Sequence, residues 1–240
     1  MRFHTLHVAD IRTETADTIS LALAPSAADR AQFAFRPGQY LTLRTRIDGE
    51  ELRRSYSICS GPDDGELRVA IKRVADGRFS AWAHGALRVG DAMEAMPPAG
   101  RFGAQLARDG LYLGVAAGSG ITPLLSILKS VLTAGAGSRF VLLYGSRATA
   151  QIIFRDQLEA LKDRFMARLS VVHVLSREQQ DLPVLHGRLD GARVLTLLRG
   201  LADVPAIDHA FLCGPADMID GVGAALAGAG LDAGRIHSER

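Results

Sequence analysis

The stretch Leu111-Tyr-Leu-Gly-Val-Ala-Ala-Gly-Ser-Gly-Ile-Thr-Pro123 decides the fold of the second half of the chain. Its first seven residues, Leu111 to Ala117, form a near-continuous apolar run, as expected of a strand covered on both faces. Gly118 and Gly120 then allow a tight turn, and the apolar spacing from Thr122 to Ala134 indicates a helix. We therefore predict a strand, a turn and a helix of a parallel α/β sheet.

The turn between this strand and this helix has the features of a nucleotide-phosphate site. Glycines let a ligand approach the backbone, and a helix N-terminus offers N–H groups to a phosphate. Thr122 can cap the helix, and Pro123 suits its first turn. The alternative is a plain turn without a ligand, because Pro123 stands where G-x-G-x-x-G would place its third glycine. The strand–helix context favours nucleotide binding.

Strands and helices alternate along the rest of this half. Phe140–Tyr144, Leu169–Leu175 and Ala210–Cys213 are apolar runs with the length of buried strands. The pattern over Ile152–Phe165 predicts an amphipathic helix, and a helix rich in small residues starts after Gly214. Such alternation predicts βαβ units and a parallel sheet.

The first half of the chain has the pattern of a β domain. Tyr40–Ile47 alternates apolar and polar residues, and Leu67, Val69 and Ile71 repeat this pattern. Turn sequences such as Gly61-Pro-Asp-Asp-Gly65 separate the strands. Short strands with such spacing favour an antiparallel barrel or sandwich.

The length and composition fit two modest globular domains. We predict a β domain over residues 1–104, a linker over 105–110 and an α/β domain over 111–240. Apolar residues make up 48% and charged residues 22% of the 240 residues. The net charge of +2 provides no basic field for nucleic acid, and no segment is long enough to cross a bilayer.

Cysteine usage bounds the redox chemistry. Cys59 and Cys213 are the only two cysteines and lie far apart, so a reducing, cytoplasmic setting is expected. A plant-type [2Fe–2S] cluster needs four thiolates, so the chain cannot hold one alone. The histidines show no ligand spacing, and we predict no metal site.

Two segments of the β domain have residues that suit a flavin nucleotide. In Arg54-Ser55-Tyr56-Ser57 the guanidinium can clamp a pyrophosphate, the phenol can stack on a flavin ring, and Ser57 can donate to the N5/O4 edge. The alternative is an ordinary amphipathic strand with Tyr56 in the core. Gly77-Arg78-Phe79-Ser80 is typical of a second phosphate loop, with Ser80 leading a short helix, or of a plain turn with an N-cap.

Cys213-Gly214-Pro215 ends a predicted parallel strand, at the sheet edge where ligands gather. Small residues there would let a nicotinamide lie against a flavin. Cys213 is alternatively a small buried apolar residue, and no paired histidine marks it as a nucleophile.

These segments, in this order, resemble the ferredoxin–NADP(+) reductase superfamily over essentially the whole chain. The likeness is greatest to the reductase components of phenylacetyl-CoA epoxidase (phenylacetate degradation) systems. The resemblance implies an antiparallel six-stranded Greek-key FAD barrel followed by a Rossmann-like, parallel-sheet NAD(P)-binding domain. The segments that carry it are Phe35–Gln39, Asp48–Arg54, Ala117–Pro123, Leu185–Arg188 and Cys213–Pro215.

The resemblance also implies residue roles. It places Arg54 on the FAD pyrophosphate, Tyr56 and Ser57 at the isoalloxazine, and Thr122 and Cys213 beside the nicotinamide. The polar groups expected nearest the reacting ring, and taken as catalytic candidates with Cys213, are Ser57 and Glu239. The cofactor-binding candidates are Arg54, Ser55, Tyr56, Ser57, Val69, Ala70, Ile71, Lys72, Gly77, Arg78, Phe79, Ser80, Gly118, Gly120, Thr122, Pro123, Ser146, Arg147, Ser176, Arg177, Cys213, Gly214 and Pro215.

Two Ser-Arg pairs bear on the choice of nicotinamide. Ser146-Arg147 and Ser176-Arg177 follow the second and third strands of the nucleotide domain, where the superfamily tests for the 2′-phosphate. Arginine suits a phosphate monoester, so NADPH is favoured over NADH. The alternative is that both arginines are solvent-exposed loop residues.

The sequence therefore predicts an FAD-dependent NAD(P)H oxidoreductase. Hydride passes to FAD, and single electrons then pass to an iron–sulfur centre on a missing C-terminal domain or a separate protein, feeding an oxygenase. The resembling proteins carry a C-terminal [2Fe–2S] domain, whereas this sequence stops at Ile236–Arg240. One alternative is a non-catalytic flavin-binding electron-transfer subunit that does not accept external NAD(P)H. Another is an NAD(P)-dependent dehydrogenase without flavin.

Overall fold

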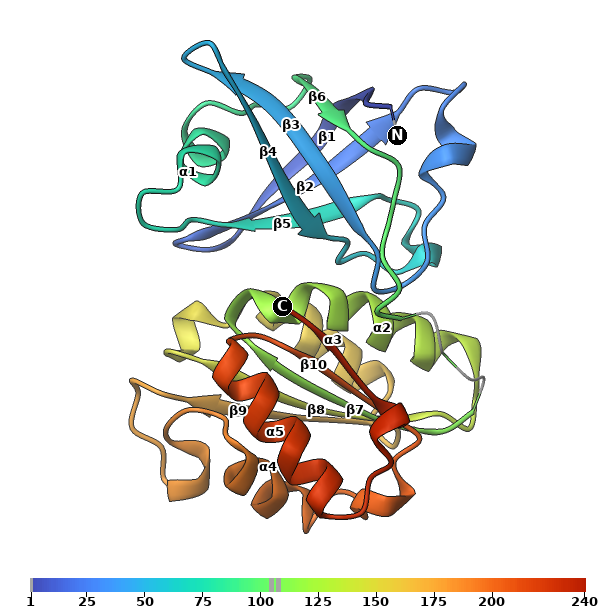
Figure 1. The fold of residues 1–240 in the computed structure, drawn as a ribbon, viewed down its shortest axis with the longest axis vertical. Helices are drawn as coiled ribbons and strands as arrows, with labels where there is room; N and C mark the ends of the chain where they lie inside the picture. Colours follow the sequence, from blue (N-terminus) through green and yellow to red (C-terminus); the bar gives the residue numbers. More distant parts are fainter. Residues whose placement is uncertain (1, 104–105, 107–108) are drawn as a thin grey trace.

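The computed structural model describes residues 2–103, 106 and 109–240 and arranges them in two domains, one above the other in Figure 1. The first domain is an antiparallel sheet of six strands with one α-helix beside it. Its elements are β1 (His4–Thr15), β2 (Thr18–Pro25), β3 (Tyr40–Ile47), β4 (Glu50–Ser57), β5 (Arg68–Lys72), α1 (Arg78–Gly85) and β6 (Ala92–Ala95), with short 3₁₀ turns at Arg30–Phe33 and Pro62–Asp64.

The sheet closes on itself as a barrel. Its strand order is β4-β3-β6-β1-β2-β5, and Ile58, directly after β4, pairs with Val69 of β5. Inward-facing apolar side chains fill the interior, among them Leu6, Leu21 and Leu41, which are fully buried. The predicted six-stranded antiparallel barrel is confirmed.

The second domain has a parallel sheet between two layers of helices. Its strand order is β11-β10-β7-β8-β9. Helices α2 and α3 pack on one face and α4 and α5 on the other, as Figure 1 shows. The predicted α/β architecture is confirmed. The elements are β7 (Leu111–Ala117), α2 (Ile121–Ala134), β8 (Arg139–Ser146), α3 (Arg155–Arg164), β9 (Leu169–Leu175), α4 (Gly191–Leu198), β10 (His209–Cys213), α5 (Ala216–Gly228) and β11 (Ile236–Glu239), with 3₁₀ turns at 118–120, 149–151, 183–185, 204–206 and 233–235.

In the second domain the structure differs from the expected elements at the start of α3 and in two elements that were not predicted. Helix α3 begins at Arg155 rather than Ile152, because Phe154 adopts a left-handed backbone (φ 61°) and buries its ring before the helix starts. Helix α4 and strand β11 were not predicted at all. The predicted linker 105–110 falls largely on residues 105, 107 and 108, which lie outside the described residues.

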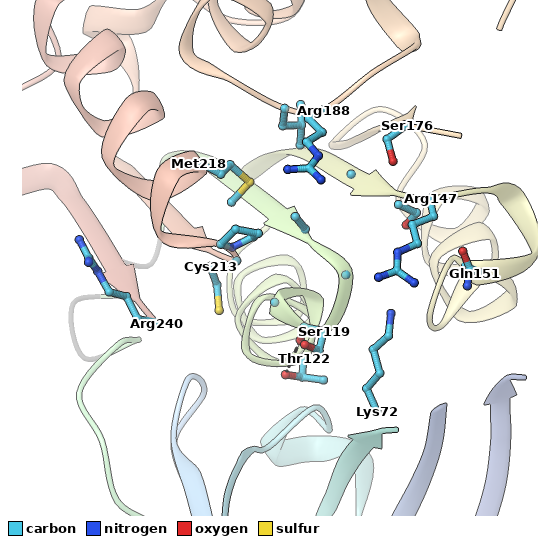
Figure 2. Close-up of a pocket in the computed structure, with 18 of the residues that line it drawn as sticks. Lys72, Ser119, Thr122, Arg147, Gln151, Ser176, Arg188, Cys213, Met218 and Arg240 are labelled. Atoms are coloured by element: carbon cyan, nitrogen blue, oxygen red, sulfur yellow. Dashed lines mark hydrogen bonds between the residues drawn. The ribbon is translucent and has the colours of Figure 1, made fainter. Parts of the chain in front are cut away.

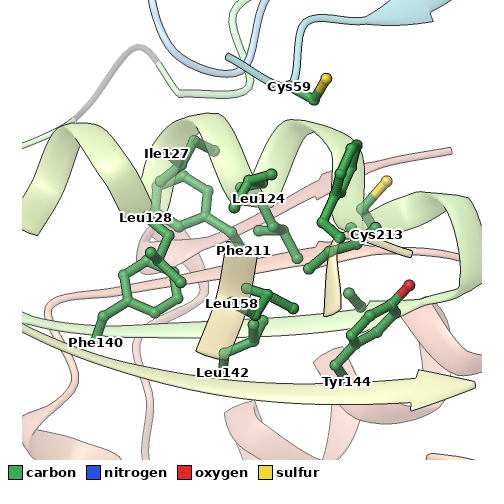
Figure 3. Packing of buried hydrophobic residues seen from close by; sticks show 14 of the residues in the cluster. Cys59, Leu124, Ile127, Leu128, Phe140, Leu142, Tyr144, Leu158, Phe211 and Cys213 are labelled. Carbon is green, nitrogen blue, oxygen red and sulfur yellow. The ribbon is translucent and has the colours of Figure 1, made fainter. Parts of the chain in front are cut away.

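Helix α2 holds the two domains together. Cys59 of the barrel packs into the same apolar cluster as Leu124 and Ile127 of α2, as Figure 3 shows. The Lys129 amine of α2 donates to Asp64 Oδ2 at 2.6 Å. This contact sets the end of β4 against the carboxyl edge of the parallel sheet.

Candidate functional site

A cleft of about 650 Å³ lies where the barrel meets the carboxyl ends of β7, β8 and β10 (Figure 2). Side chains from both domains line it. The lining residues from the barrel are Ser55, Tyr56, Ser57, Ala70, Lys72 and Val74; those from the second domain include Gly118, Ser119, Gly120, Thr122, Ser146, Arg147, Gln151, Ser176, Arg177, Arg188, Cys213, Gly214, Pro215, Met218, Glu239 and Arg240.

The glycine turn after β7 touches the end of β10. Gly118 has a φ of +55°, a conformation that glycine adopts without steric cost. A Cβ on Gly120 would lie 2.1 Å from the carbonyl oxygen of Cys213, so only glycine allows this approach. The two segments that the sequence singled out in this domain therefore form one surface of the cleft.

Thr122 does not cap α2 as predicted. Its hydroxyl donates to the Ser119 carbonyl oxygen at 2.9 Å. The helix begins one residue earlier, at Ile121, with Gly120 in the capping position and no side-chain cap. Because the 3₁₀ turn of Gly118–Gly120 runs directly into the helix, Thr122 already lies inside its first turn. Thr122 lines the cleft, and Pro123, also in that turn, is buried.

Tyr144 of β8 holds the glycine turn in place through hydrogen bonds of its hydroxyl. The sequence offered no signal for this role. The Tyr144 hydroxyl donates to the Gly118 carbonyl oxygen at 3.0 Å and accepts from the Ile153 N–H at 3.3 Å. The ring is fully buried, and burial raises the pKa of the phenol. The hydroxyl thus remains protonated and fixes the carbonyl of Gly118.

The three catalytic candidates come together. Ser57, at the end of β4, donates to Glu239 Oε1 at 2.8 Å across 182 residues of sequence. Glu239, on β11, stands in register with Cys213 on β10. Burial raises the pKa of the Glu239 carboxyl. Burial, followed by the nearby Glu239 charge, also raises the pKa of the Cys213 thiol to about 12, so at neutral pH it is not a thiolate nucleophile.

The barrel side of the cleft combines aromatic and small residues. Tyr56 lines the cleft and packs on Phe79, with ring centroids 5.6 Å apart. Burial raises the pKa of the Tyr56 phenol to about 12. Val69 and Ile71 point into the barrel core and are fully buried, so they can offer a ligand only their backbone.

Other candidates lie outside the cleft lining. Arg54 is exposed, and its guanidinium donates to the Arg53 carbonyl oxygen at 2.7 Å. Gly77 precedes the first turn of α1, where the Ser80 hydroxyl accepts from the Val74 N–H and donates to the Gly77 carbonyl. Arg78 pairs with Glu50. A role for these residues in binding phosphate remains a prediction.

Cations gather along the rim formed by the ends of β8 and β9. Arg147 and Arg177 line the cleft, as does Arg188, to which the sequence reasoning assigned no role. Within the described part of the chain, none of these three guanidinium groups makes an ion pair or a hydrogen bond. Lys72 points toward Arg147 from the barrel in Figure 2, and its amine lies 3.5 Å from the Asp17 carboxylate.

Arg188 reaches the cleft through a backbone excursion that a linear pattern does not reveal. After β9 the chain turns back, and His186 forms a parallel bridge with Leu175. Arg193 of α4 fixes this excursion by donating to the carbonyl oxygens of Val184 (3.1 Å) and His186 (2.5 Å).

Among residues 2–103, 106 and 109–240, no three His, Cys, Asp or Glu side chains form a metal-binding group. The same residues contain no helix with the length and hydropathy needed to span a membrane.

Comparison with known proteins agrees with this geometry. Residues 5–103 match the oxidoreductase FAD-binding domain, and residues 115–223 match the oxidoreductase NAD-binding domain. One of the subunits of 1,2-phenylacetyl-CoA epoxidase from Escherichia coli K12 is 43% identical over 99% of this chain and 67% of its own length. The chain belongs to the ferredoxin reductase family of FAD- and NAD-binding oxidoreductases.

A second relative and a solved structure support the assignment. The ferredoxin reductase component of 3-ketosteroid-9-alpha-monooxygenase from Rhodococcus rhodochrous is 39% identical over 98% of this chain and 64% of its own length. The chain thus spans about two thirds of the length of both relatives. The flavohem-like FAD/NAD-binding domain of nitric oxide dioxygenase from Vibrio cholerae superimposes with a TM-score of 0.82 at 25% identity, covering 98% of this chain and 97% of that domain.

Proposed function

We propose that this FAD-dependent NAD(P)H oxidoreductase takes its electrons from NADPH and delivers them singly to an iron–sulfur acceptor that serves an oxygenase. The observation that carries the proposal is the interdomain cleft in which Ser57 of the FAD-binding domain meets Glu239 of the NAD-binding domain at 2.8 Å. A cofactor and a nucleotide bound to separate domains would meet there.

The residues present fit FAD. Tyr56 offers an aromatic ring for a flat cofactor. A Cβ on Gly118 would point into open cleft, its nearest neighbour being the Lys72 amine at 4.0 Å, so the missing side chain leaves room for a ligand. We assign the ring side to Ser55, Tyr56, Ser57 and Lys72, with backbone contacts from Val69 to Ile71, and the phosphate side to Arg54 and Gly77–Ser80. When bound, FAD would supply the conversion of a two-electron hydride donor into single electrons.

The protein's own groups orient the reactants and hold a proton. Ser57 keeps its O–H directed at Glu239, and the raised pKa of Glu239 lets Oε1 or Oε2 hold a proton at a higher pH than a solvated glutamate would. Cys213 stays a neutral thiol, so its part is to shape the cleft rather than to attack a substrate. Gly214 and Pro215 line the cleft next to Cys213 and carry no bulky side chain, which would leave room for a nicotinamide ring.

NADPH is favoured by the rim of unpaired guanidinium groups. Arg147, Arg177 and Arg188 make no ion pair with described residues, and arginine binds phosphate monoesters in a bidentate manner. NADH lacks this phosphate and gains nothing from the rim.

The acceptor and the setting rest on the relatives. One is named as an epoxidase subunit and another as the ferredoxin reductase component of a monooxygenase, which supports an oxygenase as the final recipient. The chain's two cysteines are free and buried, so the cluster would lie elsewhere, in a fused domain or a separate protein. Free thiols also support a cytoplasmic location.

Anaerobic titration of the flavin-loaded protein tests the proposal. Flavin absorbance should bleach with one equivalent of NADPH, and NADH should need a much higher concentration. An unchanged flavin spectrum with both nucleotides would instead identify an electron-transfer subunit fed by another protein. A purified protein that takes up no FAD would refute the flavin assignment itself.

A further inference from the structure

The loops that follow β8 and β9 stay joined beyond the ends of the strands. The Ser176 N–H donates to the Ser146 carbonyl oxygen at 3.0 Å, and the Arg177 N–H donates to the Arg147 carbonyl oxygen at 2.8 Å. Neighbouring strands in a sheet lie about 4.8 Å apart, and these bonds continue that spacing. Arg147 and Arg177, hereafter the arginine pair, therefore leave adjacent backbones at the same edge of the cleft.

The next residue, Glu178, joins the two loops through hydrogen bonds of its side chain. Its Oε2 accepts from the Thr149 N–H at 2.7 Å, and its Oε1 accepts from the Thr149 hydroxyl at 2.6 Å. Both carboxylate oxygens thus engage one residue of the opposite loop. These hydrogen bonds lower the pKa of Glu178, so it carries its charge at neutral pH.

This engagement explains why the arginine pair has no ionic partner. A guanidinium within reach of an ionised carboxylate can donate a charge-assisted hydrogen bond to it. Here Thr149 occupies the carboxylate of Glu178, and within the described residues the arginine pair makes no ion pair. The rim keeps its positive charge although an acidic residue lies directly beside it.

We propose that Glu178 and Thr149 form a latch that positions the arginine pair for a phosphate monoester and keeps the Glu178 carboxylate away from it. The inference rests on the proposed use of NADPH and deepens it. Neither Thr149 nor Glu178 lines the cleft, so Glu178 is a positioning residue.

Two substitutions open the latch in different ways. Thr149→Val removes the hydroxyl donor and frees one oxygen of a charged Glu178 to pair with an arginine. We expect the KM for NADPH to rise about fivefold to tenfold, since one lost charge-assisted hydrogen bond corresponds to roughly a factor of ten. Glu178→Gln removes the competing charge and loosens the loops, and should raise this KM by only about twofold to threefold.

The double variant separates the latch from simple loss of structure. In Thr149→Val/Glu178→Gln the freed side chain is neutral, so the KM for NADPH should recover to the value of Glu178→Gln alone. The kcat and the KM for NADH should stay within about twofold of wild type in all three variants. Glu159→Gln, the same change at a surface pair with Arg155 (2.9 Å), is the matched control and should change nothing.

Calorimetry with adenosine 2′,5′-bisphosphate and with 5′-AMP measures the same effect without turnover. Wild type should bind the bisphosphate more tightly, and Thr149→Val should lose most of that difference. If wild type discriminates and Thr149→Val retains the full difference, or if the double variant is no better than Thr149→Val, the latch is wrong. If wild type does not discriminate, the proposed NADPH preference fails first, and the latch fails with it.

Discussion

Replacing Tyr144 with phenylalanine isolates the contribution of one buried hydroxyl to the glycine turn. The Gly118 carbonyl would keep one partner, the Ile121 N–H, so its loss is small. The Ile153 N–H would lose the Tyr144 oxygen, and Ile153 is fully buried, so no water can replace it. An unpaired buried donor costs about 1–3 kcal/mol. We expect a loss of about 2 kcal/mol in the free energy of unfolding, near the middle of this range.

The assay is thermal and urea denaturation of the flavin-loaded variant, followed by circular dichroism. For a protein of this size, 1 kcal/mol corresponds to about 2–4 °C, so Tm should fall by about 4–8 °C. Tyr40→Phe is the control, because its half-buried hydroxyl makes no hydrogen bond with the described residues. The reasoning is refuted if Tyr144→Phe unfolds within about 0.5 kcal/mol of wild type, a shift usual for a surface change.

Three further predictions concern the cleft and the domain contact. Gly120→Ala places a Cβ 2.1 Å from the Cys213 carbonyl oxygen. The dissociation constant for NADPH, measured by calorimetry, should therefore rise at least tenfold. Unchanged binding would show that the backbone of the turn shifts to accommodate the methyl group. Burial raises the pKa of Glu239 above its ordinary 4.5, so the folded state binds more protons and the free energy of unfolding should fall as pH rises from 4.5 through the raised pKa. In Glu239→Gln this slope, measured by urea titration, should disappear, and a retained slope would assign it to another group. Lys129→Met removes the 2.6 Å bond to Asp64, a partly exposed pair, and should lower stability by no more than about 1 kcal/mol; a larger loss would mean that the pair orders the domain contact.

The main elements were predictable because the pattern of apolar residues in a short stretch of sequence indicates which faces of a strand are buried. The strands β3 and β7 have the predicted ends, since alternation marks one buried face and a continuous apolar run marks two. The glycine turn was also located correctly. Its cap was not, because the 3₁₀ turn that shifts the helix start to Ile121 depends on contacts with β10 that a local pattern does not contain.

The site was only partly accessible from sequence. Ser57 and Glu239 were expected near the same ring from family resemblance, but their direct hydrogen bond depends on β11, a strand of four residues without a distinct pattern. Arg188 and Tyr144 act through a backbone excursion and a buried hydroxyl. Such roles depend on tertiary packing and cannot be predicted from residue type alone.

The packing of Cys59 against the barrel-facing side of α2 has a consequence for protein engineering. Here the apolar cluster of one half is completed by Cys59 and Phe102 of the other. The second domain expressed alone would expose an apolar surface on α2 and would tend to aggregate. Chimaeras should therefore exchange both sides of this contact together, even where the donor and recipient halves are each well behaved in their own proteins.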